Sequence, residues 1–216
     1  ITVTVNTRFH RDNRFDRASV IDMGHELIRR SRTLDEATAI MRSLKSASTW
    51  GFVVSSAAEG RAVLFETTSE ETAVVEAAPG AEHIVSTNRY QTAAMQPGEV
   101  TTSPVFAVDS DCRARRLGMA VEAAAGRGLS AEDLQGLLGD LVDLGACDAA
   151  PETRRLLGNC IMHPASVQSV VFEPEAARLR LSVGRAPTGF GPYVEVPWAW
   201  DGPVGLVETY DADTET

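Results

Sequence analysis

The stretch that decides the fold is WGFVVSSAAEGRAVLFETTSEETAVVEA, residues 50–77. It contains three short runs rich in β-branched and aromatic residues, which are typical of strands, at 50–56, 61–67 and 72–77. Parallel neighbours need a crossover of about a dozen residues or more, so strands this close in sequence must pair antiparallel. The stretch therefore predicts an antiparallel meander, which HIVST at residues 83–87 would extend by a fourth strand.

An opening strand and two helices are predicted on the N-terminal side of the meander. Residues 1–6, ITVTVN, alternate polar and apolar side chains as a strand does. Residues 17–30 then place apolar side chains at the spacing of one helix face. A second helix is predicted at residues 34–45, because Thr33 and Glu36 form the sequence pattern of a capping box.

On the C-terminal side of the meander the pattern returns to helices and then to strands. Helices are predicted at residues 111–127 and 130–143, with Ser130 at the N-cap of the second. Residues 165–184 predict a hairpin, and YVEVPWAW at 193–200 predicts an edge strand. Since helices and antiparallel strands occur in blocks, the sequence predicts an α+β fold with helices packed on sheet faces.

The composition bounds the size of the domain and the kinds of partner. A chain of 216 residues with 44% apolar residues can bury a substantial core. We expect residues 1–200 to form a single α+β domain, followed by an acidic tail at 201–216. The net charge of −10 argues against binding to nucleic acid or anionic membranes, which requires basic patches. No run approaches the roughly 18–20 apolar residues of a membrane helix, and we expect a cytoplasmic protein.

The three cysteines are too few, and odd in number, for a secreted disulfide framework. We expect Cys112, Cys147 and Cys160 to be reduced thiols that pack as small apolar side chains. Cys160 and His163 have a C-x-x-H spacing that could bind a metal ion, but no second ligand pair lies near them in sequence. The sequence therefore predicts neither a metal site nor a cofactor.

No familiar catalytic motif is present in the 216 residues. The sequence lacks the G-x-S-x-G turn, the P-loop, the H-E-x-x-H zinc helix and the glycine-rich dinucleotide turn. The polar loop at residues 91–108 contains two prolines and several threonines, and it is longer than most structureless connections. This length indicates a binding loop.

The segment before that loop raises a question about Asn88. Asparagine is depleted in strands, yet the predicted strand at 83–87 ends in Thr87 and runs directly into Asn88. One interpretation is that Asn88 caps or turns the chain. The other is that its carboxamide is held at the strand end to donate a hydrogen bond to a substrate. From these residues alone, both interpretations stay open.

Six segments follow one another in a recognisable order: ITVTVN, TLDEATAIMRSL, GFVVSSAAEGRAVLFETT, HIVSTNRY, DSDCRARRLGMA and SVQSVVFEPEAARLRLSVGRAPTG. This order resembles the acyl-coenzyme A:6-aminopenicillanate acyltransferase-like family of N-terminal-nucleophile hydrolases. The Thr-Asn pair at a strand end and the final hairpin leading into Gly-Arg-x-Pro are the most specific features. The likeness covers nearly the whole chain.

The resemblance implies a four-layer αββα fold, in which two antiparallel sheets lie between two layers of helices. In such proteins autoproteolysis frees an N-terminal cysteine, which is the nucleophile and uses its own α-amine as general base. The first residue here is Ile1, which has no nucleophilic group. The resemblance thus implies a C-terminal portion whose nucleophile lies on an upstream fragment or subunit. Without that segment, we expect ITVTVN, which reads as an inner strand, to be exposed or paired with another chain.

The implied activity is that of an amidohydrolase or acyltransferase acting on an amide or acyl-thioester substrate. Asn88 matches the asparagine that helps to form the family's oxyanion hole, and Thr87 and Asn6 are further candidates for the same pocket. A strand-end turn is an equally good interpretation of Asn6. His163 stands where the penicillin-forming member has an arginine. This difference indicates another substrate and leaves His163 as a candidate substrate-binding residue.

We expect Asn88 to be substantially buried in a cleft bounded by Asn6 and the 91–108 loop, with its side chain not used to cap a turn. Two other functions stay open. One is a related amidase for bile salts or acyl-homoserine lactones. The other is a catalytically inactive domain of the same fold that binds a ligand or a partner.

Overall fold

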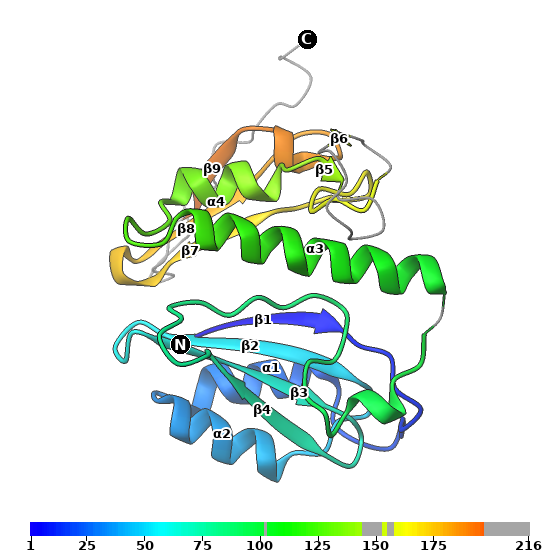
Figure 1. Ribbon diagram of the computed structural model, residues 1–216. Coiled ribbons are helices and arrows are strands. Elements are labelled where there is room, and N and C mark those ends of the chain that lie inside the picture. The colour runs from blue at the N-terminus through cyan, green and yellow to red at the C-terminus, as the bar shows by residue number, and fades with distance from the viewer. Residues whose placement is uncertain (102, 144–152, 155–157, 197–216) are drawn as a thin grey trace. The chain divides into compact units, whose positions relative to one another are not determined.

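The computed structural model describes residues 1–101, 103–143, 153–154 and 158–196 (Figure 1). The chain forms two compact units, the first covering Ile1–Ala114 and the second beginning at Arg115. The predicted acidic tail at 201–216 lies outside the described residues. None of the described helices combines the length and the apolar character that a bilayer crossing requires.

The first unit is built on a four-stranded antiparallel sheet. In both sequence and spatial order its strands are β1 (Thr2–Thr7), β2 (Trp50–Ser56), β3 (Arg61–Thr67) and β4 (Thr72–Glu76). The predicted opening strand and the three-stranded meander are therefore confirmed. Among the described strands β1 pairs with β2 alone, and Thr4 and Val5 on this edge strand are exposed.

The prediction of a strand at residues 83–87 is wrong, because these residues belong to no strand. Their polar groups bond to side chains instead of to a neighbouring strand. The Val85 carbonyl accepts from Gln91 Nε2 (2.7 Å), and Ser86 Oγ donates to Asn6 Oδ1 (3.0 Å). An alternating pattern becomes a strand only where a ladder partner meets it, and that partner is not visible in the sequence.

Two helices, α1 (Val20–Arg30) and α2 (Leu34–Ser43), connect β1 to β2. Helix α1 begins later than predicted, because Ser19 Oγ accepts from the backbone N–H of Asp22 (3.1 Å) and fixes the start. Helix α2 begins as predicted, with the complete capping box at Thr33.

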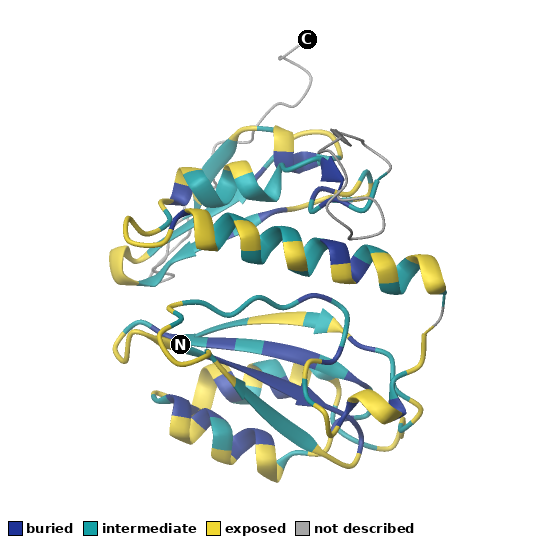
Figure 2. Ribbon diagram, viewed as in Figure 1, coloured by how far each residue is buried: buried dark blue, intermediate teal, exposed yellow. Residues whose placement is uncertain are grey.

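The core of the first unit lies between these helices and one face of the sheet. Its buried apolar cluster consists of Met23, Leu27, Leu34, Ala37, Ile40, Met41, Phe52, Val54, Val63 and Phe65. Figure 2 shows the buried residues along the two central strands, β2 and β3. Since side chains alternate along a strand, Gly51 and Glu66, which are in register across β2 and β3, belong to the other face.

Helix α3 (Pro104–Ala123) begins earlier than predicted and contributes residues to both units. Proline is favoured in the first turn of a helix, where its missing N–H needs no partner. Ser103 Oγ accepts from the backbone N–H of Val105 (3.2 Å) at this start. The helix thus includes the last residues of the predicted 91–108 loop, and a short 3-10 turn, η1 (Gln96–Gly98), lies within the rest.

The second unit contains helix α4 (Ala131–Leu138). It starts with the predicted capping box, in which Ser130 and Asp133 each bond to the other's backbone N–H. It ends earlier than predicted at Gly139, whose N–H donates to the Gln135 carbonyl (3.1 Å). A glycine after the last turn is typical of a helix C-terminus.

The strands of the second unit form two small antiparallel sheets, made of β5 (Val142–Asp143) with β6 (Thr153–Arg154), and of β7 (Val170–Glu173), β8 (Arg178–Ser182) and β9 (Tyr193–Val196). In the larger sheet β8 pairs with both β7 and β9. The predicted hairpin and the edge strand are confirmed. Short 3-10 turns, η2 (Pro174–Ala176) and η3 (Thr188–Phe190), complete the connections.

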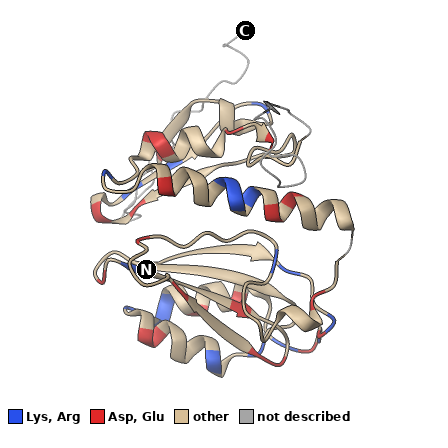
Figure 3. Ribbon diagram, viewed as in Figure 1, with Lys and Arg blue, Asp and Glu red and all other residues tan. Residues whose placement is uncertain are grey.

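The α+β class is confirmed by four α-helices and by antiparallel sheets of four and three strands among the described residues. Charged residues lie mainly on helices and connections (Figure 3). Strands β1 and β2 have no charged residue, whereas β3 has Arg61 and Glu66. Glu66 is completely buried, which is unusual for a carboxylate and draws attention to its surroundings.

Candidate functional site

Asn6, Thr87 and Asn88 come together at the end of β1, although they are far apart in sequence. Asn88 Nδ2 donates to the backbone carbonyl of Thr7 (3.0 Å). One residue before Thr87, Ser86 Oγ donates to Asn6 Oδ1 (3.0 Å). The irregular segment that replaces the predicted strand is therefore attached to β1 by side chains, with its asparagine beside the strand end.

The carboxamide of Asn88 is held on both sides. Its oxygen accepts from Arg113 Nη2 (2.9 Å), and its nitrogen uses one N–H to reach Thr7. The backbone N–H of Asn88 donates to Ser110 Oγ (2.9 Å). Within the described part of the chain, the second N–H of Nδ2 has no hydrogen-bond partner. Asn88 is half-buried, which is less than we expected, and its side chain does not cap a turn.

Thr87 is connected to Asn88 through the hydroxyl of Ser110 as well as along the chain. Its side chain is buried, and its Oγ1 accepts from Ser110 Oγ (3.0 Å). Through the completely buried Ser110, the Thr87 side chain is thus linked to the backbone of Asn88. Ser110 carries no sequence signal, since only the tertiary fold brings α3 to this segment.

Asn6 has an orientation fixed in the same way. Ser86 Oγ accepts from Arg8 Nη2 (2.9 Å) and donates to Asn6 Oδ1 (3.0 Å). In the described residues the two N–H groups of Asn6 have no partner. Both carboxamide oxygens therefore accept hydrogen bonds, and among the described residues Asn88 has one unpaired N–H and Asn6 has two.

Arg8, which bonds to Ser86, also forms a buried ion pair with Glu66. Both side chains have 0% exposure, and Arg8 Nη2 lies 3.8 Å from Glu66 Oε1. Gly51 leaves room for the guanidinium, because a Cβ at this position would lie 2.7 Å from Arg8 Nη2. Burial lowers the pKa of Arg8, and the negative charge of Glu66 acts in the opposite direction. Arg8 Nε and Nη1 are buried without a hydrogen-bond partner among the described residues. Burial of this guanidinium therefore costs folding free energy.

Glu66 also fixes the start of the predicted binding loop. It accepts from the backbone N–H groups of Gln91 (2.7 Å) and Thr92 (3.0 Å), and from Thr92 Oγ1 (2.9 Å). Next to them, Tyr90 donates its hydroxyl to the Thr67 carbonyl (2.9 Å), and burial raises the pKa of this phenol. The Tyr90 side chain therefore stays protonated, and the loop is attached firmly to β3.

Arg113 is positioned within α3 by a carboxylate one turn earlier. Its Nη2 lies 2.8 Å from Asp109 Oδ2, and the two side chains are largely buried. Arginine side chains are mostly exposed in folded proteins. The structure instead directs Arg113 to the Asn88 carboxamide.

His163 lies in the second unit, whereas Asn6, Thr87 and Asn88 lie in the first. Its side chain is exposed, and its Nδ1 accepts from the backbone N–H of Ala165 (3.1 Å). The backbone N–H of His163 donates to Ser166 Oγ (3.2 Å). These contacts give His163 a role in the turn before the hairpin.

The prediction of reduced thiols is wrong for Cys112, which is disulfide-bonded. Cys160 is a reduced thiol and is buried, with Sγ donating to the Met162 carbonyl (2.8 Å). Cys147 lies outside the described residues. A sequence pattern cannot reveal pairing between distant cysteines, whereas burial of a small thiol follows from its apolar neighbours. In the described ranges no group of three His, Cys, Asp or Glu side chains could hold a metal ion.

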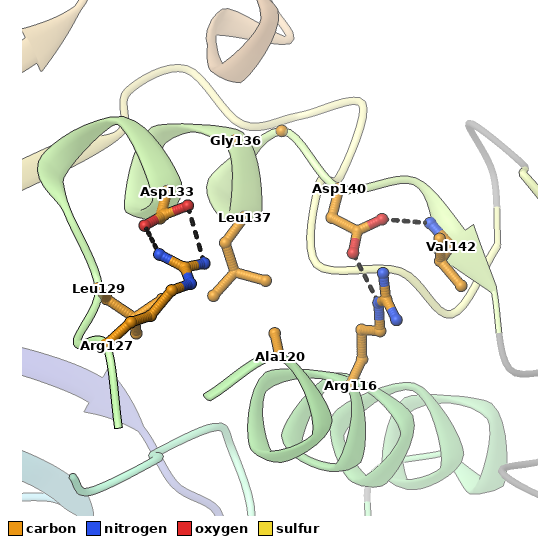
Figure 4. Close-up of a pocket in the computed structure, with 10 residues that line it drawn as sticks. Arg116, Ala120, Arg127, Leu129, Asp133, Gly136, Leu137, Asp140 and Val142 are labelled. Atoms are coloured by element: carbon orange, nitrogen blue, oxygen red, sulfur yellow. Dashed lines mark hydrogen bonds and ion pairs between the residues drawn. The ribbon is translucent and has the colours of Figure 1, made fainter. Parts of the chain in front are cut away.

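The second unit contains a cavity of about 570 Å³ between α3, α4 and β5 (Figure 4). Arg127 forms two bonds with Asp133 (2.6 and 3.2 Å), and Arg116 Nε donates to Asp140 (2.6 Å). Leu137 lies between the two ion pairs in Figure 4. Each arginine is matched by an aspartate, so the lining has no excess charge that would select an anion.

A scan of the sequence against protein-family models and a search of curated proteins found no match. The chemistry available at the end of β1 is hydrogen-bond donation from two fixed carboxamides. Arg113 bonds to the oxygen of Asn88, and Arg8 is linked to the oxygen of Asn6 through Ser86. Donors of this kind suit an oxygen that becomes negatively charged during a reaction.

Proposed function

We propose that the chain is the C-terminal portion of an N-terminal-nucleophile amidohydrolase or acyltransferase. Its substrate is an amide or an acyl-thioester, and Asn88 donates a hydrogen bond to the oxyanion. One observation carries the proposal: the Asn88 carboxamide is held between Arg113 and the Thr7 carbonyl, with one N–H left to donate. The order of the sequence segments supports the same reaction class.

In this mechanism a thiolate attacks the carbonyl carbon, and the carbonyl oxygen takes up negative charge. Asn88 Nδ2 stabilises that charge without rearranging, because its orientation is already fixed. Asn6 is a second donor, oriented through Ser86 by Arg8. The charges of Arg8 and Arg113 polarise the two carboxamides, so that the N–H groups become stronger donors.

The nucleophile is a cysteine on a segment upstream of Ile1, with its α-amine as general base. The edge of β1 that does not pair with β2 is the place where that segment adds its strands. Exposed Thr4 and Val5 are consistent with an edge that another segment covers.

The proposed layer arrangement is an αββα sandwich. The four-stranded sheet has α1 and α2 on one face. In the three-stranded sheet, Phe172, Leu179 and Val196 are in register on one face, while the opposite face includes Arg180, which bonds to Glu132 of α4 (2.7 Å). His163 is retained as a substrate-binding residue in this proposal.

The proposal is tested with the gene product that contains the upstream segment. We expect mass spectrometry of the mature protein to find a free N-terminal cysteine. A panel of acyl-amides and acyl-thioesters should include a substrate that is turned over, and turnover should stop when that cysteine is replaced by alanine. An unprocessed chain without turnover on the panel would instead favour a binding domain of the same fold.

A further inference from the structure

Helix α1 has apolar side chains on two opposite sides. Met23 and Leu27 are completely buried against the sheet. Ile21 and Ile28 are 65% and 53% exposed. Residues seven apart lie on nearly the same face of a helix, so the two isoleucines form one apolar stripe on the outside of the unit.

Gly24 lies between the two isoleucines in sequence. A glycine inside a helix lowers its stability relative to alanine. A Cβ at this position would meet no atom within 4 Å, so packing inside the unit does not require glycine. A missing side chain beside an apolar stripe allows another helix to approach closely, as interaxial distances depend on the side chains at the contact.

Two exposed charges, Asp22 and Arg29, lie on one flank of this stripe, again seven residues apart. Consider a second copy of α1 packed antiparallel, with a two-fold axis passing between Gly24 and His25. Ile21 then lies opposite the partner's Ile28. Asp22 and the partner's Arg29 lie on the same flank, about 3 Å apart along the helix axis, which the long arginine side chain can span. A parallel two-fold arrangement would instead place this flank against the partner's opposite flank, where α1 has Val20, Gly24 and Leu27 and no charged residue. The face is therefore complementary to itself only in the antiparallel arrangement.

We propose that the outer face of α1, made of Ile21, Gly24, His25 and Ile28, binds a second copy of this chain in an antiparallel, two-fold symmetric contact. Met23 and Leu27 fix the helix on the sheet, so the face is rigid before association. A contact of one short helix per copy lies at the small end of interface sizes. The expected dissociation constant is therefore weak, on the order of 10–1000 µM.

Sedimentation equilibrium of the full chain, from about 10 µM to 1 mM, tests the proposal. The mean mass should rise toward that of a dimer. Ile21→Lys and Ile28→Lys should each weaken association by about tenfold or more, because a charge would be buried in the contact. Val105→Lys, at a 72% exposed position of α3, is the matched control and should associate as the wild type does.

A charge exchange distinguishes this geometry from other associations. Asp22→Arg and Arg29→Asp should each weaken association by several-fold, and the double variant should restore it, since both pairs then form with reversed sign. Circular dichroism would establish that each variant is folded. A monomer at 1 mM, normal association of Ile21→Lys, or no recovery in the folded double variant would overturn the proposal.

Discussion

Replacement of Glu66 by alanine should lower the free energy of unfolding by about 3–5 kcal/mol. The variant leaves the completely buried guanidinium of Arg8 without its counter-charge, and a buried charge without a partner is strongly destabilising. It also removes the acceptor for the backbone N–H groups of Gln91 and Thr92. Urea unfolding at pH 7, followed by circular dichroism, would measure the change.

Two further variants separate the ion pair from general effects. Glu76→Ala removes one partner of an exposed pair with Arg61 (3.9 Å) and should cost less than about 1 kcal/mol. The double variant Arg8→Met, Glu66→Gln removes both charges and keeps an acceptor for the loop. It should be more stable than Glu66→Ala. If Glu66→Ala differed from the wild type by less than about 1 kcal/mol, the buried pair would not anchor this region.

Replacement of Asn88 by alanine should lower the turnover number of the processed enzyme by about 10²–10³-fold, with a much smaller change in the Michaelis constant. The lost hydrogen bond strengthens only as negative charge develops on the substrate oxygen. Asn88→Asp should be at least as harmful, because it replaces a donor with a negatively charged acceptor. Steady-state kinetics on the best substrate of the acyl panel would measure both variants.

Asn13 provides a matched control for Asn88. It is an exposed asparagine whose Nδ2 donates to the His10 carbonyl (2.6 Å), and Asn13→Ala should retain normal turnover. Near-normal turnover of Asn88→Ala would remove the oxyanion role. Asn88 would then be a structural residue that joins α3 to the end of β1.

The elements that were predictable from the sequence are those whose causes are local. The capping residues Thr33 and Ser130 bond within four residues of chain, so their pattern is visible in sequence. Strands β2 and β3 are rich in β-branched and aromatic residues and are joined by a short turn. The alternation at 83–87 was misleading, because a strand also needs a neighbour, and side chains of β1 take that place.

The supporting contacts of the candidate site were not predictable, because each joins residues far apart in sequence. In the sequence, Glu66 is an ordinary polar residue near the end of a predicted strand. Only the structure shows its ion pair with Arg8. In the sequence, Arg113 has the pattern of an ordinary arginine on a helix. Only the structure shows its hydrogen bond to the Asn88 side-chain oxygen. Asn88 itself was identified from the resemblance rather than from any local rule. The sequence therefore suggested Asn88, and the structure adds the groups that hold its carboxamide.

The most direct test of the oxyanion proposal is one distance in a crystal structure of the processed protein. The aldehyde analogue of the acyl substrate reacts with the nucleophilic cysteine to form a thiohemiacetal. The oxygen of this thiohemiacetal occupies the position of the oxyanion. We predict that Asn88 Nδ2 lies about 2.7–3.1 Å from this oxygen while Arg113 still binds Oδ1. A separation of more than about 4 Å, beyond hydrogen-bond reach, would contradict the proposed role of Asn88.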